Sequence, residues 1–342
     1  MTTTTLDIAV IGAGNIGTAM AALLSRSGAH VHLVARGARL AEVREHGVVL
    51  DDRGDVIHAR PMTESALTRP MDAVFLCVKS QSLATAVRDN ASGIGPHTWV
   101  IPMVNGLPFW FFATPEDMGD IPYLDPEGDL AALLSPRQIL GAVLLMTVRM
   151  EGNRALSSNT PTLSLGPVTD GVDRSRLASL IEALEAGGVR TDLSEDIRQK
   201  VLVKLLANLT TNPLTALSGA MLEEVGQTPL LREISTQLAT EFRNWTTTRG
   251  FDLPENDWLV DLMIDAGPFP TSMLQDALAG RALELDAICR APLALSRRDG
   301  MGMPLLARLI AEVEAHDTLP LSETALPEAL DRLLPNTDFS KG

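Results

Sequence analysis

The chain has 342 residues, enough for two domains that each bury a core of their own. Its formal net charge is −15, with 43 Asp and Glu against 28 Lys and Arg, which argues against nucleic acid or an anionic membrane surface as a partner. An anionic ligand must therefore be bound by local cations or by helix N-termini.

The two cysteines, Cys77 and Cys289, lie in apolar runs far apart in the sequence. They are expected to be buried free thiols in a reducing compartment. No apolar run reaches the length of a membrane span, and the N-terminus MTTTTLD lacks the basic residues of a signal peptide. These features predict a cytoplasmic protein with no membrane partner.

The first elements form a strand, a glycine-rich turn, a helix and a second strand. Leu6–Ile11 is a short apolar run, Ile16–Ser27 has a helical pattern closed by Gly28, and His30–Ala35 is again strand-like. Between the first strand and the helix stands GAGNIG, residues 12–17. This context gives the glycine pattern meaning, because a lone GxGxxG is usually only a turn.

The glycines of this turn predict a dinucleotide-binding loop. Gly12 permits the tight turn, Gly14 lets a pyrophosphate approach the backbone, and Gly17 allows close packing of helix on strand. The phosphates would then lie at a helix N-terminus, where the amides and the helix dipole favour negative charge. We expect the cofactor to contact all six residues of the loop, Gly12, Ala13, Gly14, Asn15, Ile16 and Gly17.

The end of the second strand indicates which dinucleotide binds. NAD-dependent enzymes typically have Asp or Glu there to hold the ribose 2′-hydroxyl. This chain has Arg36, with Arg39 three residues later. A guanidinium suits a 2′-phosphate, so the sequence predicts NADP(H), although a solvated arginine pair is the alternative.

The rest of the first domain continues as strands and helices of a parallel sheet. We predict a hairpin over 48–50 and 56–59, strands Asp72–Val78, Trp99–Val104, Gly141–Arg149, Pro161–Leu165 and Val189–Asp192, and a helix Val172–Ala186. Lys79 and Asn105 follow two of these strands, and ligands gather at the carboxyl ends of strands in such sheets. We expect both near the nicotinamide, with a solvated lysine and a plain Asn-Gly turn as the alternatives.

Four of the chain's 13 aromatic residues (8 Phe, 4 Trp and 1 Tyr) stand together as Phe109–Phe112, directly after Asn105-Gly106. They favour either local core packing, or an apolar wall for the substrate or a subunit contact. The segment 113–136 that follows is rich in Pro, Asp and Gly and is interpreted as an inserted loop or hairpin.

From Ser194 onward the periodicity is helical. The sequence therefore predicts an α/β protein with a Rossmann-type domain over 1–193 and an all-helical substrate domain over 194–342. We expect the active site in the cleft between the two domains. Residues beyond about Leu334 are expected to be disordered.

One helix of the second domain combines apolar flanks with a polar stripe. Within Lys200–Leu217, the residues Lys200, Lys204, Asn208 and Asn212 recur every four positions and so share one helical face. Lysine and asparagine are costly to bury without partners, so the stripe favours a wet cleft or a ligand over an ordinary solvated face. Asn212-Pro213 is expected to disturb the helix.

Three blocks of residues together make the chain resemble the ketopantoate reductase (2-dehydropantoate 2-reductase) family. They are GAGNIG, then Lys204-Leu-Leu-Ala-Asn208-Leu-Thr-Thr-Asn212-Pro-Leu-Thr-Ala, and Ser272-Met-Leu-Gln-Asp276 with Glu284-Leu-Asp286. Arg36, Lys79 and Asn105-Gly106 also stand where that family has such residues. The likeness covers most of the chain, and the aromatic run marks a divergent branch.

The resemblance implies NADPH-dependent reduction of a 2-keto acid to a 2-hydroxy acid, in pantothenate biosynthesis or outside it. Lys204 would be the general acid, and Glu284 would pair with it or hold the substrate hydroxyl and the nicotinamide ribose. Asn208, Asn212 and Ser272 would bind the substrate, and Asn105 would bridge substrate and cofactor. The strand at Val148 would offer backbone to the cofactor.

Two positions depart from the family pattern. Phe269 stands where members that act on ketopantoate usually have an asparagine, and a second substrate-side asparagine is replaced by Leu222. Apolar side chains thus replace two polar contacts, while the residues of hydride transfer remain. The sequence therefore predicts a substrate more apolar than ketopantoate.

Two other functions remain open. An opine-type dehydrogenase reduces an imine on a similar plan but typically relies on a His–Asp pair, and none of the six histidines lies in the three blocks. A non-catalytic NADPH sensor would need the glycine loop but neither Lys204 nor Glu284. A monomer and a homodimer are both compatible with the sequence, and no metal site is predicted.

Overall fold

The computed structural model describes residues 5–170 and 173–334, apart from the side chain of Arg174. The chain divides into two compact units. The first contains residues 1–104, 108–121 and 125–200, and the second contains 105–107, 122–124 and 201–342. The predicted disordered end beyond Leu334 lies outside the described residues. The predicted boundary at residue 193 stays a prediction. No helix of the described part is long and apolar enough to cross a membrane.

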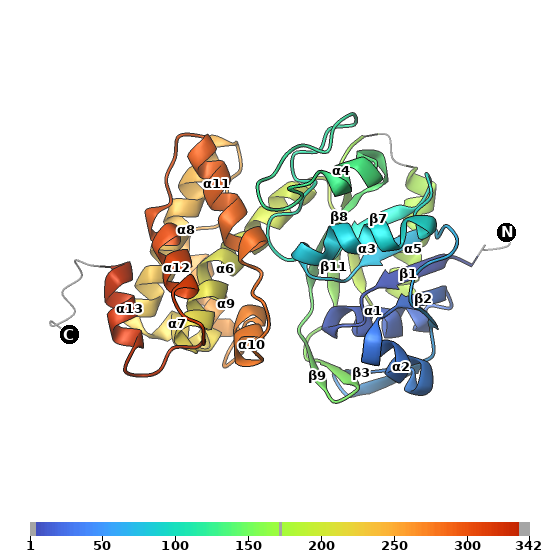
Figure 1. Cartoon of the computed structure of the whole chain (residues 1–342), viewed down its shortest axis with the longest axis horizontal. Helices are drawn as coiled ribbons and strands as arrows, with labels where there is room; N and C mark the ends of the chain where they lie inside the picture. The colour runs from blue at the N-terminus through green and yellow to red at the C-terminus, as the bar shows by residue number, and fades with distance from the viewer. Residues whose placement is uncertain (1–4, 171–172, 335–342) are drawn as a thin grey trace. The chain divides into compact units, whose positions relative to one another are not determined.

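The first unit is built on a five-stranded parallel sheet in the order β5-β2-β1-β6-β7 (Figure 1). Its strands are β1 (Asp7–Ile11), β2 (His30–Val34), β5 (Met62–Glu64), β6 (Ala73–Leu76) and β7 (Trp99–Pro102). Four of them were predicted. β5 was missed because three residues with one exposed methionine have too little apolar pattern to indicate a strand.

Two smaller sheets complete the first unit. One has the order β4-β3-β10-β9, with β3 (Val48–Asp52), β4 (Asp55–Ala59), β9 (Val148–Glu151) and β10 (Arg154–Ser157); the other has the order β12-β11-β8, with β8 (Leu140–Leu145), β11 (Thr162–Pro167) and β12 (Arg190–Leu193). The single strand predicted over 141–149 was therefore wrong. It is interrupted after Leu145, where the Thr147 amide donates to Asn159 Oδ1 at 2.7 Å, and its halves join different sheets.

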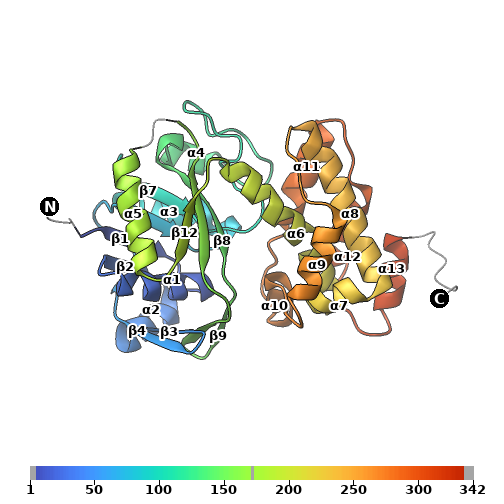
Figure 2. The same ribbon diagram turned by 180° about the vertical axis from the view of Figure 1, so that it is seen from behind.

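Helix α1 (Asn15–Arg26) lies against both the parallel sheet and the β3–β4 hairpin. Every residue from Gly17 to Leu24 is buried, as expected for a helix that is apolar on all sides. The other helices of this unit are α2 (Gly37–His46), α3 (Leu83–Asp89), α4 (Asp129–Leu133) and α5 (Arg174–Ala186), with short 3₁₀ turns η1 (Ser80–Ser82), η2 (Ala91–Gly93) and η3 (Pro136–Gln138). Figure 2 shows α5 from the side opposite to Figure 1.

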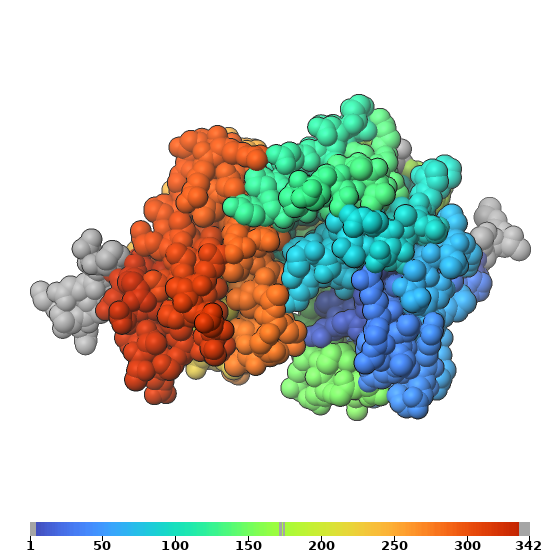
Figure 3. All heavy atoms as spheres, viewed as in Figure 1, coloured from blue at the N-terminus to red at the C-terminus, as the bar shows by residue number. Residues whose placement is uncertain are grey.

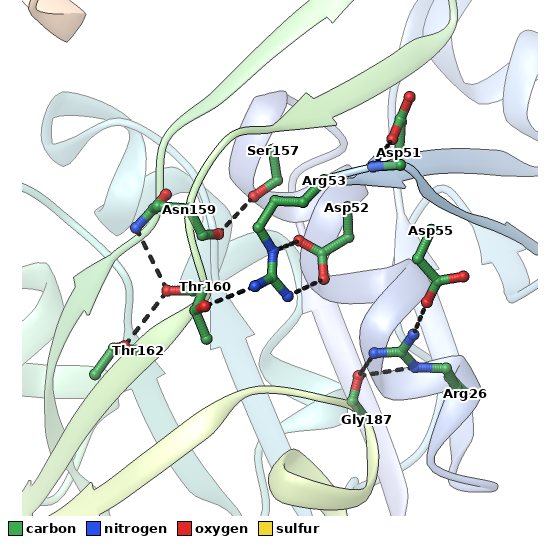
Figure 4. Close-up of polar contacts among 11 residues, drawn as sticks. Arg26, Asp51, Asp52, Arg53, Asp55, Ser157, Asn159, Thr160, Thr162 and Gly187 are labelled. Atoms are coloured by element: carbon green, nitrogen blue, oxygen red, sulfur yellow. Dashed lines mark hydrogen bonds and ion pairs between the residues drawn. The ribbon is translucent and has the colours of Figure 1, made fainter. Parts of the chain in front are cut away.

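The β3–β4 turn is held by arginines that neutralise its acidic residues (Figure 4). Arg53 has a left-handed φ of 55°, and its guanidinium donates to both carboxylate oxygens of buried Asp52 and to Thr160 Oγ1. Arg26 pairs with Asp55 at 2.7 Å, and Arg154 pairs with Asp51 at 2.5 Å. These carboxylates are therefore structural ion pairs.

The second unit is all-helical, as predicted. It contains most of α6 (Ile197–Ser218), then α7 (Leu222–Gln227), α8 (Pro229–Thr248), α9 (Asn256–Asp265), α10 (Ser272–Leu278), the π-helical turn η4 (Asp286–Arg290), α11 (Ala291–Arg298), α12 (Pro304–Glu314) and α13 (Leu326–Leu333). Pro213 lies inside α6 without ending it, so the predicted disturbance does not interrupt the helix. Buried Phe242 and Trp245 of α8 belong to the core of this unit.

Candidate active site

The glycine loop has the geometry that the sequence predicts. Gly12 has a left-handed φ of 104°, and a Cβ there would lie 2.5 Å from the Cys77 carbonyl oxygen. A Cβ on Gly17 would lie 1.7 Å from the Gly12 carbonyl oxygen, so only glycine lets α1 approach this turn. Gly14 differs, because it is exposed and a Cβ there would meet nothing within 4 Å. The loop is thus tightly packed on the protein side and open at the start of α1, which suits a pyrophosphate.

Side chains from other elements hold this loop. Asn15 Nδ2 donates to the Val148 carbonyl oxygen of β9 at 3.0 Å. Arg39 Nε donates to the Ala13 carbonyl oxygen at 3.1 Å, and another nitrogen of Arg39 donates to Thr18 Oγ1 at 2.9 Å. Figure 3 shows the surface hollowed here, with dark blue atoms set back between the light green β9–β10 segment and the blue α2 segment. Ile16 is half-buried at the same loop.

The two arginines after β2 have different tasks. Arg36 immediately precedes α2, its side chain is 57% exposed, and it forms an ion pair with Asp89 of α3 at 2.5 Å. Arg39 is only 22% exposed and is committed to Ala13, Thr18 and Glu42. The sequence alone is compatible with two arginines that bind one phosphate. In the structure Arg39 supports the glycine loop, whereas Arg36 pairs with Asp89 outside that loop.

Lys79 and Cys77 follow β6 at the carboxyl edge of the parallel sheet. Lys79 is half-buried and directly precedes η1, where its carbonyl oxygen accepts from the Ser82 amide at 2.8 Å. Cys77 and Cys289 are both free cysteines, as predicted; Cys289 is buried as expected, whereas Cys77 is only half-buried. Burial raises the pKa of the Cys77 thiol to about 12 and also raises the pKa of Cys289, so neither is a thiolate nucleophile near neutral pH.

The polar stripe of α6 divides in two. Lys200 belongs to the first unit, where its ammonium pairs with Asp192 at 2.6 Å and donates to Ser164 Oγ at 3.1 Å. The inclusion of Lys200 in a ligand-facing row was therefore wrong, because a carboxylate on β12 already neutralises it. Lys204, Asn208 and Asn212 remain together on the face of α6 in the second unit.

Lys204 is the most perturbed basic group of this face. Desolvation by burial lowers the pKa of its ammonium to about 8, and the charge of Glu284 partly opposes this by favouring the protonated form. Both residues belong to the second unit. A lysine with a pKa close to physiological pH, beside a carboxylate, is suited to give and regain a proton.

The two asparagines of the stripe continue the same face. Asn208 is half-buried and Asn212 is 3% exposed. Within the described part of the chain, Asn212 Nδ2 is buried with no hydrogen-bond partner. An unsatisfied buried amide costs about 1–3 kcal/mol, so a partner such as an ordered water or a ligand is expected for it.

The segment before α10 places Ser272 by a network that the sequence did not indicate. Thr271 precedes α10 and its Oγ1 accepts from the Leu274 amide at 3.1 Å. The same hydroxyl is 2.6 Å from Thr215 Oγ1 of α6, in a buried contact. Ser272 itself is exposed. Nothing in the spacing of Thr215 and Thr271, 56 residues apart, signals this pairing.

The two positions that depart from the family pattern are neighbours. The Leu222 amide donates to the Phe269 carbonyl oxygen at 3.1 Å, and the Glu223 amide donates to the Gly267 carbonyl oxygen at 3.2 Å. Leu222 and Phe269 are both half-buried. Two apolar residues chosen from separate parts of the sequence thus lie on adjoining backbone.

Asn105-Gly106 forms part of the second unit although it follows β7. Asn105 is half-buried, and Gly106 has a left-handed φ of 86°. The next amide, that of Leu107, donates to the Ala287 carbonyl oxygen of η4 at 2.8 Å. Asn105 is therefore close in sequence to a contact with the turn that follows Glu284.

The aromatic run is mainly core. Phe109, Trp110 and Phe111 are at most 3% exposed, and only Phe112 is half-buried. A Cβ on Gly141 would meet the Trp110 ring at 2.6 Å. Arg198 of α6 donates to the carbonyl oxygens of Phe111 in the run and of Ala113 just after it, and also to that of Val168. Of the alternatives, core packing describes three of the four aromatics, and these three cannot form an exposed substrate wall.

A parallel-sheet unit with a tight glycine loop, followed by a helical unit with a desolvated lysine beside a glutamate, defines a two-domain nicotinamide-dependent dehydrogenase. In the described residues no group of three or more His, Cys, Asp or Glu is placed to hold a metal ion.

Comparison with known proteins agrees with this class. Residues 8–162 match the family described as Ketopantoate reductase PanE/ApbA, and residues 196–317 match Ketopantoate reductase PanE/ApbA C terminal. A 2-dehydropantoate 2-reductase of Mesorhizobium japonicum is 30% identical over 90% of this chain and 97% of its own. The crystal structure of a candidate ketopantoate reductase from Ralstonia solanacearum MolK2 is 27% identical, with a TM-score of 0.85 over 92% of this chain and 98% of that one.

The ternary structure of D-mandelate dehydrogenase with NADH and anilino(oxo)acetate shares the fold, with 21% identity and a TM-score of 0.77 over 91% of this chain and 98% of that one. The protein belongs to the ketopantoate reductase family. It is accordingly an oxidoreductase that reduces a 2-keto acid with a nicotinamide cofactor.

Proposed function

We propose that the protein reduces a 2-keto acid to the 2-hydroxy acid with NADPH, and that Lys204 is the general acid. The observation that carries this proposal is the desolvated Lys204 ammonium on one face of α6, with the Glu284 charge acting on it and the unsatisfied amide of Asn212 two turns further along. An imine-reducing opine-type enzyme has no comparable support, since no histidine lies in this cluster.

The glycine loop, residues 12–17, would hold the pyrophosphate, and Arg36 would hold the 2′-phosphate. Lys79, Asn105 and the backbone at Val148 would complete the cofactor site. When bound, NADPH supplies the hydride. The open side of Gly14 and the closed sides of Gly12 and Gly17 fit such a ligand.

In the proposed mechanism, Lys204 Nζ gives its proton to the carbonyl oxygen as negative charge develops there, and the ammonium stabilises that charge beforehand. Glu284 keeps the lysine protonated and takes part in holding the new hydroxyl and the ribose. Asn208, Asn212 and Ser272 would orient the carboxylate and carbonyl of the substrate. The residues lie on α6 and at the start of α10, and helices hold side chains more firmly than loops do.

The substrate proposal rests on Phe269 and Leu222. Their backbones are hydrogen-bonded to each other, so both side chains start from one place in the second unit, where asparagines would hold a terminal hydroxyl. An apolar pocket gains about 1–3 kcal/mol per added methylene, whereas a missing polar partner penalises a hydroxyl. We therefore expect higher kcat/KM for 2-keto acids with branched-chain or aromatic groups than for ketopantoate.

The experiment follows NADPH absorbance with ketopantoate, 2-ketoisovalerate, 2-ketoisocaproate and phenylglyoxylate. The last is included because D-mandelate dehydrogenase has this fold. Phe269→Asn should raise kcat/KM for ketopantoate relative to the apolar acids, with Phe251→Asn, a phenylalanine outside the three blocks, as the control. A native preference for ketopantoate over every apolar analogue would sink the substrate proposal, whereas no turnover of any 2-keto acid would sink the function itself.

The pH dependence of the reaction tests the pair Lys204 and Glu284. Because the pKa of Lys204 is lowered to about 8, kcat/KM for reduction should fall as the pH rises through about 8 and the ammonium loses its proton. The Glu284 charge raises the pKa of Lys204, so Glu284→Gln should move this alkaline limb to lower pH. The measurement is kcat/KM at saturating NADPH from about pH 6 to about pH 10. A limb that stays in place or moves upward in Glu284→Gln contradicts the assignment.

We also propose a homodimer. A ketopantoate reductase from Staphylococcus aureus with the same fold is described as dimeric, at 19% identity and a TM-score of 0.70. Light scattering on the purified protein distinguishes a dimer from a monomer of 36.7 kDa.

A further inference from the structure

The turn η4 has an irregular hydrogen-bond register, and a proline, Pro292, follows it closely in the sequence. The Ala291 amide donates to the Asp286 carbonyl oxygen, five residues back instead of four. In this register the next carbonyl, that of Ala287, would need the amide of residue 292. That residue is Pro292, which has no N–H. The helix therefore leaves the Ala287 carbonyl oxygen for a donor from elsewhere.

The segment after β7 supplies that donor. The Leu107 amide donates to the Ala287 carbonyl oxygen at 2.8 Å, and Leu107 is 1% exposed, so the bond is shielded from water. The approach depends on Gly106. A Cβ there would lie 2.5 Å from the Ala287 carbonyl carbon and 2.6 Å from its oxygen. Pro292 and Gly106 are thus complementary, because one frees the carbonyl and the other lets the backbone reach it.

The Leu107–Ala287 hydrogen bond lies next in sequence to two residues of the proposed site. Asn105 is the residue before Gly106, and Glu284 lies just before η4, where its carbonyl oxygen accepts from the Ile288 amide at 3.3 Å. If η4 changed to the ordinary four-residue register, the chain before it would turn by about 100° relative to α11. Glu284 would then leave its place near Lys204.

We propose that Pro292 and Gly106 are positioning residues, which hold Asn105 and Glu284 in place through the Leu107–Ala287 hydrogen bond. The inference rests on the proposed function, since it concerns the geometry around Lys204. It assigns no chemistry to either residue. Their effect passes through the two side chains that they position.

The first test is Pro292→Ala, which gives α11 an amide that competes for the register of η4. Misplacement of this kind lowers kcat by about ten- to a hundredfold. The alkaline limb of kcat/KM should also move to lower pH, as in Glu284→Gln, because Lys204 loses the charge that keeps it protonated. Pro229→Ala is the matched control, since Pro229 begins α8 next to no π-helical turn. It should keep kcat and the pH profile.

The second test is Gly106→Ala against Gly300→Ala. Both glycines have left-handed φ values, 86° and 72°, but a Cβ on Gly300 would meet nothing within 4 Å. The pair therefore shares the backbone strain and differs in the contact with Ala287. Gly106→Ala should lose turnover while Gly300→Ala keeps it, with thermal unfolding measured on both.

Hydrogen exchange at the Leu107 amide measures the Leu107–Ala287 hydrogen bond independently of turnover. The amide should be protected in the native protein and exchange faster in Pro292→Ala. Suppose that Pro292→Ala loses this protection but keeps a normal kcat and an unchanged alkaline limb of kcat/KM, while Lys204→Ala is inactive. This result overturns the positioning role and leaves the proposed function standing. An unprotected Leu107 in the native protein also overturns it. Near-normal turnover of Lys204→Ala overturns the proposed function, and the positioning role falls with it.

Discussion

Lys204→Ala should lower kcat by roughly 10²–10⁴, the usual share of general acid catalysis. The reason is that the desolvated Lys204 ammonium, with a pKa of about 8, is the proton donor proposed for the carbonyl oxygen. Binding of NADPH should change little, because the pyrophosphate and 2′-phosphate would contact residues of the first unit. Stopped-flow or steady-state kinetics with a 2-keto acid, together with NADPH titration, separates the two effects.

Lys200→Ala is the matched control, one turn earlier on the same helix. Its ammonium pairs with Asp192 and donates a hydrogen bond to Ser164, so its removal should leave kcat within about twofold, as for an exposed ion pair. Equal losses in both variants would mean a structural effect of lysine removal. Near-normal turnover in a folded Lys204→Ala protein would refute the general acid.

Native protein should bind NADPH at least tenfold more tightly than NADH, a difference of about 1.4 kcal/mol. Arg36 stands where NAD-dependent enzymes carry a carboxylate, and its guanidinium is exposed before α2. Arg36→Asp should reverse the order, because a carboxylate repels the 2′-phosphate and accepts from the 2′-hydroxyl. Fluorescence titration with both cofactors measures the two Kd values.

A variant of Asp89 makes this test more specific. Asp89 pairs with Arg36 and would compete with the 2′-phosphate for its guanidinium. Asp89→Asn should increase the preference for NADPH by a few-fold, the scale of one exposed ion pair. Arg39→Ala is expected to weaken both cofactors together, since Arg39 supports the glycine loop through Ala13 and Thr18. Equal affinity of the native protein for NADPH and NADH would remove the basis for this choice.

The sequence alone determined the elements whose signal is local. The buried strands of the parallel sheet, the glycine loop and α6 have apolar patterns or glycine spacings within about twenty residues. The stripe of Lys204, Asn208 and Asn212 follows from the helical period. The family blocks added Ser272 and Glu284 to the proposed site, and the match over residues 8–162 and 196–317 confirmed the family.

Only the tertiary structure decided which polar residues already have partners. Lys200 and Lys204 are alike in the sequence, but Asp192 on β12 neutralises the first, while burial near Glu284 sets the pKa of the second. Likewise the sequence does not say that Leu107 reaches Ala287. Such pairings join residues far apart along the chain. Local sequence patterns do not predict which distant carbonyl or carboxylate the folded backbone brings within 3 Å.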